Sequence, residues 1–234
     1  MMAALTPEEI AIMALSLRVS LLAVLLCAPF AFGAAWLLAR GRFPGKLVLD
    51  VVVHLPLVLP PVVTGWLLLL LFGPSGPAGS WPERWLGVTL VFRWTGAALA
   101  AAVMAFPLMV RSMRLALESV DVRLENAART LGASRWRVLR TITLPLCLPG
   151  IAAGLILGGA RALGEFGATI TFAANIAGET RTLPLAIYGA LQAPGGEAIV
   201  LRLSLISIAL SVAALVLSEL LVRRSGARKG VHEL

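Results

Sequence analysis

The amino-acid sequence predicts an all-α polytopic membrane protein with about five transmembrane helices. Of its 234 residues, 59% are hydrophobic and only 14% are charged, and the mean hydropathy is +0.92. A soluble domain has about 45–50% apolar and about 25% charged residues. The apolar residues also occur in blocks near or above the ~18–20 residues that cross a bilayer. This composition excludes an ordinary cytosolic enzyme, and the length leaves no room for a separate soluble catalytic domain.

Five hydrophobic segments are expected to span the membrane within one transmembrane domain, residues 1–234. In order, they are residues 19–39, 48–72, 95–110, 146–172 and 203–222. Residues 10–17 either continue the first span or form an interfacial helix. The second span contains three prolines, and the fourth contains charged residues and glycines, so both are expected to be interrupted.

The positive charges predict the orientation of these spans. Three Lys and Arg residues follow the first span, seven lie between the third and fourth, and four, including Arg228 and Lys229, follow the fifth. Only six lie on the other side. Because cytoplasmic loops are enriched in Lys and Arg, we expect the N-terminus outside and the C-terminus in the cytoplasm. Three tryptophans are expected to anchor the outward loop 73–94 at the interface: Trp81, Trp85 and Trp94.

The cytoplasmic loop of residues 111–145 predicts two short helices. Apolar residues recur in the first at three- and four-residue spacing: Leu117, Val120, Leu124, Ala128 and Leu131. Gly132 is expected to end this helix, and Ser134 to cap a second helix over residues 135–141. Pro145 and Pro149 mark the return to the membrane. Two interpretations stay open from this pattern: an amphipathic pair on the lipid headgroups, or a docking element with small residues at its centre.

The spacing within the loop resembles the EAA loop of ABC importer permeases, in which a short helix inserts into a cleft of the ATPase subunit. The family places a glutamate directly before the alanine pair, where this chain has Asn126, with Glu125 one position earlier. That offset is about 100° on a helix, so the docking role carries over but not the glutamate's own contacts. The candidate coupling residues are Glu125, Asn126, Ala127, Ala128, Gly132, Ala133, Ser134, Arg135, Ile142, Leu144 and Pro145.

Longer stretches are similar to the molybdate branch of the sulfate, molybdate and tungstate permeases: HLPLVLPPVVTGW, AFPLMVRSMRLALESVD, ARTLGASRWRVLRTITLPL and GEFGATITF. The resemblance implies a type I permease with a transmembrane region of about residues 16–222, forming a homodimer in the bacterial inner membrane. It implies two ATPases on the cytoplasmic face and a periplasmic oxyanion-binding protein. It further implies import of molybdate by alternating access, with tungstate as an open second solute and a sulfate or thiosulfate permease as the alternative. ATP-Mg would bind to the ATPase, and this chain would hold no cofactor.

Two interrupted spans supply candidates for the transport pathway or gate. Prolines kink the second span, which either lines the pathway or is a structural kink buried between helices. In the fourth, Gly150, Gly154 and Gly158 predict a stripe for close helix packing. Arg161 and Glu165 lie on one helix face and either attract the anion or form a structural ion pair. The candidates are His54, Pro60, Pro61, Thr64, Arg161, Glu165 and Thr169.

The sequence shows no motif for chemistry of its own. It has no phosphate-binding loop, no GxSxG and no clustered metal ligands, so we expect neither catalytic nor metal residues and no nucleic-acid partner. Cys27 and Cys147 are expected to be small core residues. A secondary transporter would need several carboxylates within the membrane to bind a coupling ion, and Glu165 is nearly alone there. A lipid phosphotransferase would need a cluster of polar residues at the membrane interface, and the sequence shows none. The sequence therefore favours a conformational role over either rival.

Overall fold

The computed structural model describes residues 5–79, 84, 85 and 87–227; Trp81, Arg228 and Lys229 lie outside these residues. The described chain is helical and without strands, which confirms the all-α class. The elements are α1 (Pro7–Arg40), α2 (Lys46–Val58), α3 (Pro61–Phe72), α5 (Trp94–Glu118), α6 (Val122–Thr130), α7 (Arg135–Val138), the π-helix η1 (Leu139–Thr143), α8 (Leu144–Leu163), α9 (Gly167–Phe172), α10 (Leu183–Leu191) and α11 (Glu197–Ala227).

Four stretches are long and apolar enough to cross a membrane: Pro7–Arg40, Trp94–Glu118, Arg135–Leu163 and Glu197–Leu217. The pair α2 and α3 passes the same test together but is bent by 116° at the Leu59–Pro60 break. Pro60 and Pro61 explain that break, because proline lacks the backbone N–H that a continuous helix needs. Residues 10–17 continue α1 as one helix.

The core lies where α1, α5 and α8 pack together, and small side chains allow their close approach. A β-carbon added at Gly150 would lie 2.3 Å from the Ala116 Cβ, and one at Gly158 would lie 2.5 Å from the Met109 Cγ. The predicted glycine stripe of α8 is therefore confirmed as its contact with α5. Cys27 and Cys147 are both buried, as expected of core residues.

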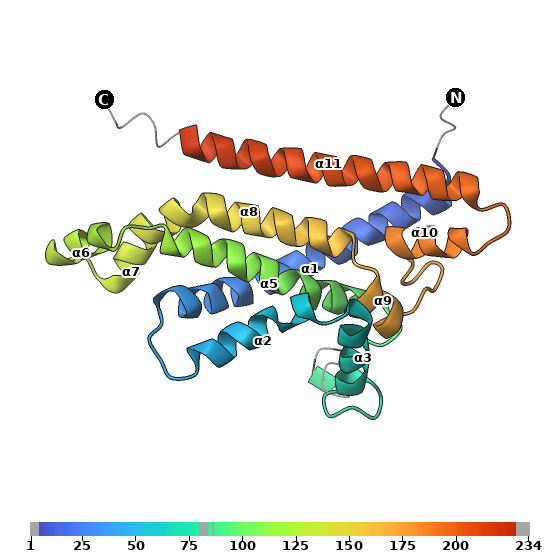
Figure 1. The fold of residues 1–234 in the computed structure, drawn as a ribbon, viewed down its shortest axis with the longest axis horizontal. Coiled ribbons are helices and arrows are strands. Elements are labelled where there is room, and N and C mark those ends of the chain that lie inside the picture. The colour runs from blue at the N-terminus through green and yellow to red at the C-terminus, as the bar shows by residue number, and fades with distance from the viewer. Residues whose placement is uncertain (1–4, 80–83, 86, 228–234) are drawn as a thin grey trace.

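The bundle has two distinct ends (Figure 1). At one end lie the loop after α1, the helices α6 and α7, and the C-terminal end of α11; we call this the basic end. The start of α1, helix α10 and the turn between α10 and α11 lie at the opposite end. The described parts of the three segments in which Lys and Arg concentrate therefore lie toward the same end of the bundle.

The predicted helices of the loop 111–145 differ from those observed. Residues 117–131 do not form one helix, because α5 ends at Glu118 and α6 starts at Val122. Asp121 caps α6 by accepting a 2.8 Å hydrogen bond from the Arg123 backbone N–H, which fixes an extended residue between the helices. The second helix does not stop at residue 141 either: α7 continues through η1 into α8, with Pro145 in the first turn of α8.

Helix α10 was not predicted. It lies between α9 and α11, in a stretch of residues 175–202 that the sequence predicted as an outward-facing loop, and packs mainly against α11. Ser16 of α1 contributes its hydroxyl oxygen, which accepts a 2.7 Å hydrogen bond from the Leu183 backbone N–H. This bond ties the N-terminal half of α1 to the start of α10.

Candidate coupling loop and gate

Helix α6 buries a charged residue and exposes apolar ones. In α6, whose residues are all described, the buried residue is the charged Glu125, which is 5% exposed. Val122 and Leu124 are about half exposed, and Leu131, directly after the helix, is 88% exposed. An exposed apolar surface of this kind is typical of a site that binds another protein or a membrane surface. The exposed apolar residues between α5 and α8 (residues 119–143), which we call the docking surface, are Val122, Leu124, Ala127, Leu131 and Trp136.

A tight turn presents this surface. Gly132 adopts a φ of +83°, a conformation that favours glycine, and nothing lies within 4 Å of where its β-carbon would be. Its N–H donates to the Arg129 carbonyl, and the Ala133 N–H donates to the Ala128 carbonyl, which closes the end of α6. Ser134 then accepts a 3.3 Å hydrogen bond from the Arg137 N–H, so the predicted stop and cap are both confirmed.

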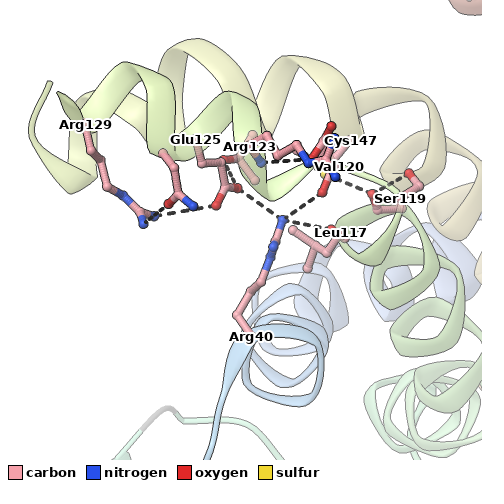
Figure 2. A network of polar contacts seen from close by, with 12 residues as sticks. Arg40, Leu117, Ser119, Val120, Arg123, Glu125, Arg129 and Cys147 are labelled. Atoms are coloured by element: carbon pink, nitrogen blue, oxygen red, sulfur yellow. Dashed lines mark hydrogen bonds and ion pairs between the residues drawn. The ribbon is translucent and has the colours of Figure 1, made fainter. Parts of the chain in front are cut away.

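The buried Glu125 side chain lies in a polar network (Figure 2). Its Oε1 lies 3.1 Å from the Arg40 Nη2 and accepts a 2.8 Å hydrogen bond from the Thr143 hydroxyl. Arg129 lies 3.5 Å from the other carboxylate oxygen. Arg40 also donates to the carbonyls of Leu117 and Val120 at the end of α5. One carboxylate therefore joins groups from α1, α6 and η1.

The remaining coupling candidates lie along the same loop but differ in exposure. Asn126 and Ala127 are exposed, whereas Ala128 and Ala133 are half-buried. The Asn126 side-chain oxygen accepts a 3.2 Å hydrogen bond from Arg129. Beyond the turn, Ser134, Arg135 and Pro145 are exposed, and Ile142 and Leu144 are half-buried.

The second and fourth predicted spans meet where α3 crosses α9, and they do so through glycines. A β-carbon on Gly65 would lie 2.6 Å from the Ala168 carbonyl oxygen, and one on Gly167 would lie 2.7 Å from the Pro61 Cβ. Thr64 and Thr169 are buried beside these positions, and the Thr64 hydroxyl has no hydrogen-bond partner among the described residues. The structure thus brings Pro61 and Thr64 together with Thr169, although they are about 100 residues apart in sequence.

His54 lies elsewhere, in a polar pocket between α2 and α5. Its Nδ1 is 2.9 Å from the Asp50 carbonyl oxygen and 3.1 Å from the Asp50 carboxylate. Arg114 bridges Asp50 at 3.1 Å and Glu118 at 2.8 Å. The pocket has a volume of about 480 Å³ and is lined by Leu47, Asp50, Val51, His54, Arg111, Arg114, Leu115 and Glu118.

Arg161 and Glu165 form the ion pair that their spacing predicts, with 2.6 Å between Nη1 and Oε2. The Glu165 side chain is buried, and its other oxygen accepts a 2.7 Å hydrogen bond from the Ala168 backbone N–H. Glu165 therefore binds both Arg161 of α8 and the first turn of α9. The charge of Arg161 is thus already paired within the chain.

The fold is a bundle of membrane-crossing helices, and the family comparison places it in the class of membrane transport subunits. The chain belongs to the family of binding-protein-dependent transport system inner membrane components, whose model matches residues 28–226. It is 61% identical over 226 residues to the molybdenum transport system permease protein ModB of Escherichia coli, covering 97% of this chain and 99% of that one. The Haemophilus influenzae ModB is 55% identical over 95% of this chain and 97% of its own.

Sulfate permeases are less similar. The sulfate transport system permease protein CysW of Synechocystis is 38% identical over 93% of this chain and 78% of its own. Among solved structures, a bacterial alginate ABC transporter in complex with a periplasmic protein that holds an alginate pentasaccharide has a TM-score of 0.73. It is 18% identical over 94% of this chain and 80% of that one, which shows a shared fold. The type I importer permease architecture is thereby confirmed.

Proposed function

We propose that this chain is the membrane-spanning permease subunit of an ATP-driven importer that carries molybdate from the periplasm into the cytoplasm. The observation that carries the importer class is α6, a short helix that exposes its apolar residues and buries its glutamate. The solute rests on the relatives, because the ModB proteins are 55–61% identical and the sulfate permease CysW is 38% identical.

The partners follow from the two ends of the bundle. The basic end faces the cytoplasm, where two ATPase subunits receive the docking surfaces of a homodimer of this chain. The opposite end, with the N-terminus and α10, faces the periplasm and an oxyanion-binding protein. ATP-Mg is bound by the ATPase, and the permease binds no cofactor of its own.

The helical connections supply a route for coupling. From the turn at Gly132, α7, η1 and α8 run on without a break to Leu163, and α9 follows after three residues. Displacement of α6 by the ATPase therefore reaches α9, which packs against α3. We assign the α3–α9 crossing as the gate and the pocket around His54 as part of the inner path. ATP can shift the equilibrium between the open and closed gate only if the ATPase binds one of these two states of the permease more tightly than the other.

The substrate experiment uses a strain that lacks its own oxyanion permeases and carries this chain with its ATPase and binding protein. Cellular molybdate, tungstate and sulfate are quantified by mass spectrometry. We expect molybdate uptake to be abolished by Gly132→Asp, because that change strains a positive-φ residue and places a charge beside the docking surface. Gly178→Asp is the matched control: its φ is +77°, its β-carbon would also meet nothing within 4 Å, and it lies outside the docking loop.

The outcomes separate the parts of the proposal. Molybdate uptake that is lost in Gly132→Asp and retained in Gly178→Asp supports both the ATP-coupled class and the solute. Sulfate uptake alone would keep the importer and reject molybdate. Uptake that survives Gly132→Asp would reject coupling through this loop.

The ion pair of α8 is expected to be structural rather than part of an anion site. In the double variant Arg161→Ala/Glu165→Gln, the amide oxygen can still accept from the Ala168 N–H, and no unpaired charge is left. We expect the apparent KM for molybdate uptake to stay within about twofold of the wild-type value. An increase of about tenfold or more in KM would show instead that Arg161 handles the anion.

A further inference from the structure

The Glu125 network includes helix α1, which is not directly connected along the chain to the docking loop. Helix α6 is connected covalently to α5 on one side and to α7 on the other. Helix α1 has no such connection, yet its last residue, Arg40, lies 3.1 Å from Glu125. The route through α7, η1 and α8 therefore omits a contact that links α6 to the first membrane helix (Figure 2).

We propose that Glu125, Arg40 and Thr143 form a joint that carries the displacement of α6 into α1 as well as into α8. In this joint Glu125 is a positioning residue: it contacts neither solute nor nucleotide and acts by keeping three helices together. The inference rests on the proposed function, since it assumes that an ATPase displaces α6.

Burial makes the joint stiff. The Glu125 side chain is 6% exposed and that of Arg40 is 20% exposed, so the pair lies largely out of water. Removing Glu125 would leave the largely buried Arg40 charge without its carboxylate partner, which is far costlier than breaking a surface ion pair. The guanidinium of Arg40 also donates to the Leu117 carbonyl at 3.1 Å, and therefore holds the end of α5 in the same place. Movement of α6 away from α1 would break the Arg40–Glu125 contact, while Arg40 stays bound to the end of α5.

Thr143 adds the third helix. It is 1% exposed and is the last residue of η1, a π-helical turn between α7 and α8. Short π-helical turns inside α-helices occur frequently at functional sites. Because the Thr143 hydroxyl donates to the same oxygen that Arg40 contacts, the irregular turn is fixed to α1 through Glu125.

The joint is not fully satisfied in the conformation described. The Arg40 Nε is buried and has no hydrogen-bond partner among the described residues. A buried donor without a partner is unfavourable, so a second arrangement that satisfies it can compete when α6 moves.

The test uses the complete transporter of permease, ATPase and binding protein in proteoliposomes, and measures molybdate transported per ATP hydrolysed. Thr143→Val removes the hydroxyl and keeps the shape of the side chain, and Thr143→Ser restores the hydroxyl. We expect about a tenfold lower ratio in Thr143→Val and in Glu125→Gln, with the ATPase still bound, and recovery in Thr143→Ser. Thr141→Val is the control, because the exposed Thr141 hydroxyl donates to the Arg137 carbonyl within its own helical turn and, among the described residues, to no part of the joint.

Three results would overturn the joint: an unchanged ratio in both variants, no recovery in Thr143→Ser, or loss of the ATPase from the variant complexes. The last would mean that the network only maintains the docking fold. Failure of the proposed function is a different result, because the wild-type complex itself would then hydrolyse ATP without moving molybdate.

Discussion

Leu131→Asp is expected to detach the ATPase without disturbing the permease. Leu131 is 88% exposed in the isolated chain, so its side chain contributes almost nothing to the fold. In the complex it would be buried, where loss of an apolar anchor costs about 2–4 kcal/mol and a buried aspartate without a partner costs more. The expected loss in ATPase affinity is therefore about 30-fold or greater. It is measured by titrating purified ATPase onto the detergent-solubilised permease.

Two variants make that result specific. Leu131→Met keeps an apolar side chain of similar volume, so it should retain the ATPase. Leu191→Asp places the same charge at an exposed leucine of α10, at the end of the bundle opposite α6, and should also retain it. If Leu131→Asp still bound the ATPase as tightly as the wild type, the docking surface would have to lie elsewhere on the basic end.

The sequence predicted the docking loop better than it predicted the contacts within it. The alanine pair, Gly132 and Ser134 are local signals for a helix, its end and the next cap, and all act as expected. The role of Glu125 was missed because it depends on Arg40, which lies 85 residues away and was counted only as a topology charge. An acidic residue in a short helix gives no sign of whether it faces water or another helix.

Hydropathy similarly located the long helices. It did not locate the positions at which helices are interrupted, because these depend on contacts that hydropathy does not report. The prolines predicted an interruption in residues 48–72, yet nothing local specifies the 116° bend between α2 and α3. Residues 117–131 have a continuous helical period, and the Asp121 cap overrides it. Gly65 was not among the predicted gate residues, because its contact with Ala168 joins segments from two different spans.

That contact predicts the second large effect: Gly65→Ala is expected to prevent the gate from closing. The new methyl group would lie 2.6 Å from the Ala168 carbonyl oxygen and 2.9 Å from both the Ala168 Cα and the Thr171 Cβ. Backbone atoms in two packed helices cannot move aside like the end of a flexible side chain, so α3 and α9 must separate, at a cost of about 1–3 kcal/mol. A gate destabilised by that amount would be open about 5- to 150-fold more often. It is measured as molybdate efflux from loaded proteoliposomes without ATP.

Gly33→Ala separates this effect from the general consequence of placing alanine in a helix. Gly33 lies inside α1, and an added β-carbon there would meet nothing within 4 Å, so the change should stabilise the helix by about 0.5–1 kcal/mol and leave efflux unaltered. The two variants add the same methyl group to the same backbone conformation, and only the neighbour differs. Raised efflux in Gly65→Ala alone would place the barrier to the anion at the α3–α9 crossing. If both variants showed equal efflux and Gly65→Ala were only less stable to heat, the α3–α9 crossing would be a packing contact. The gate would then have to lie elsewhere in the bundle.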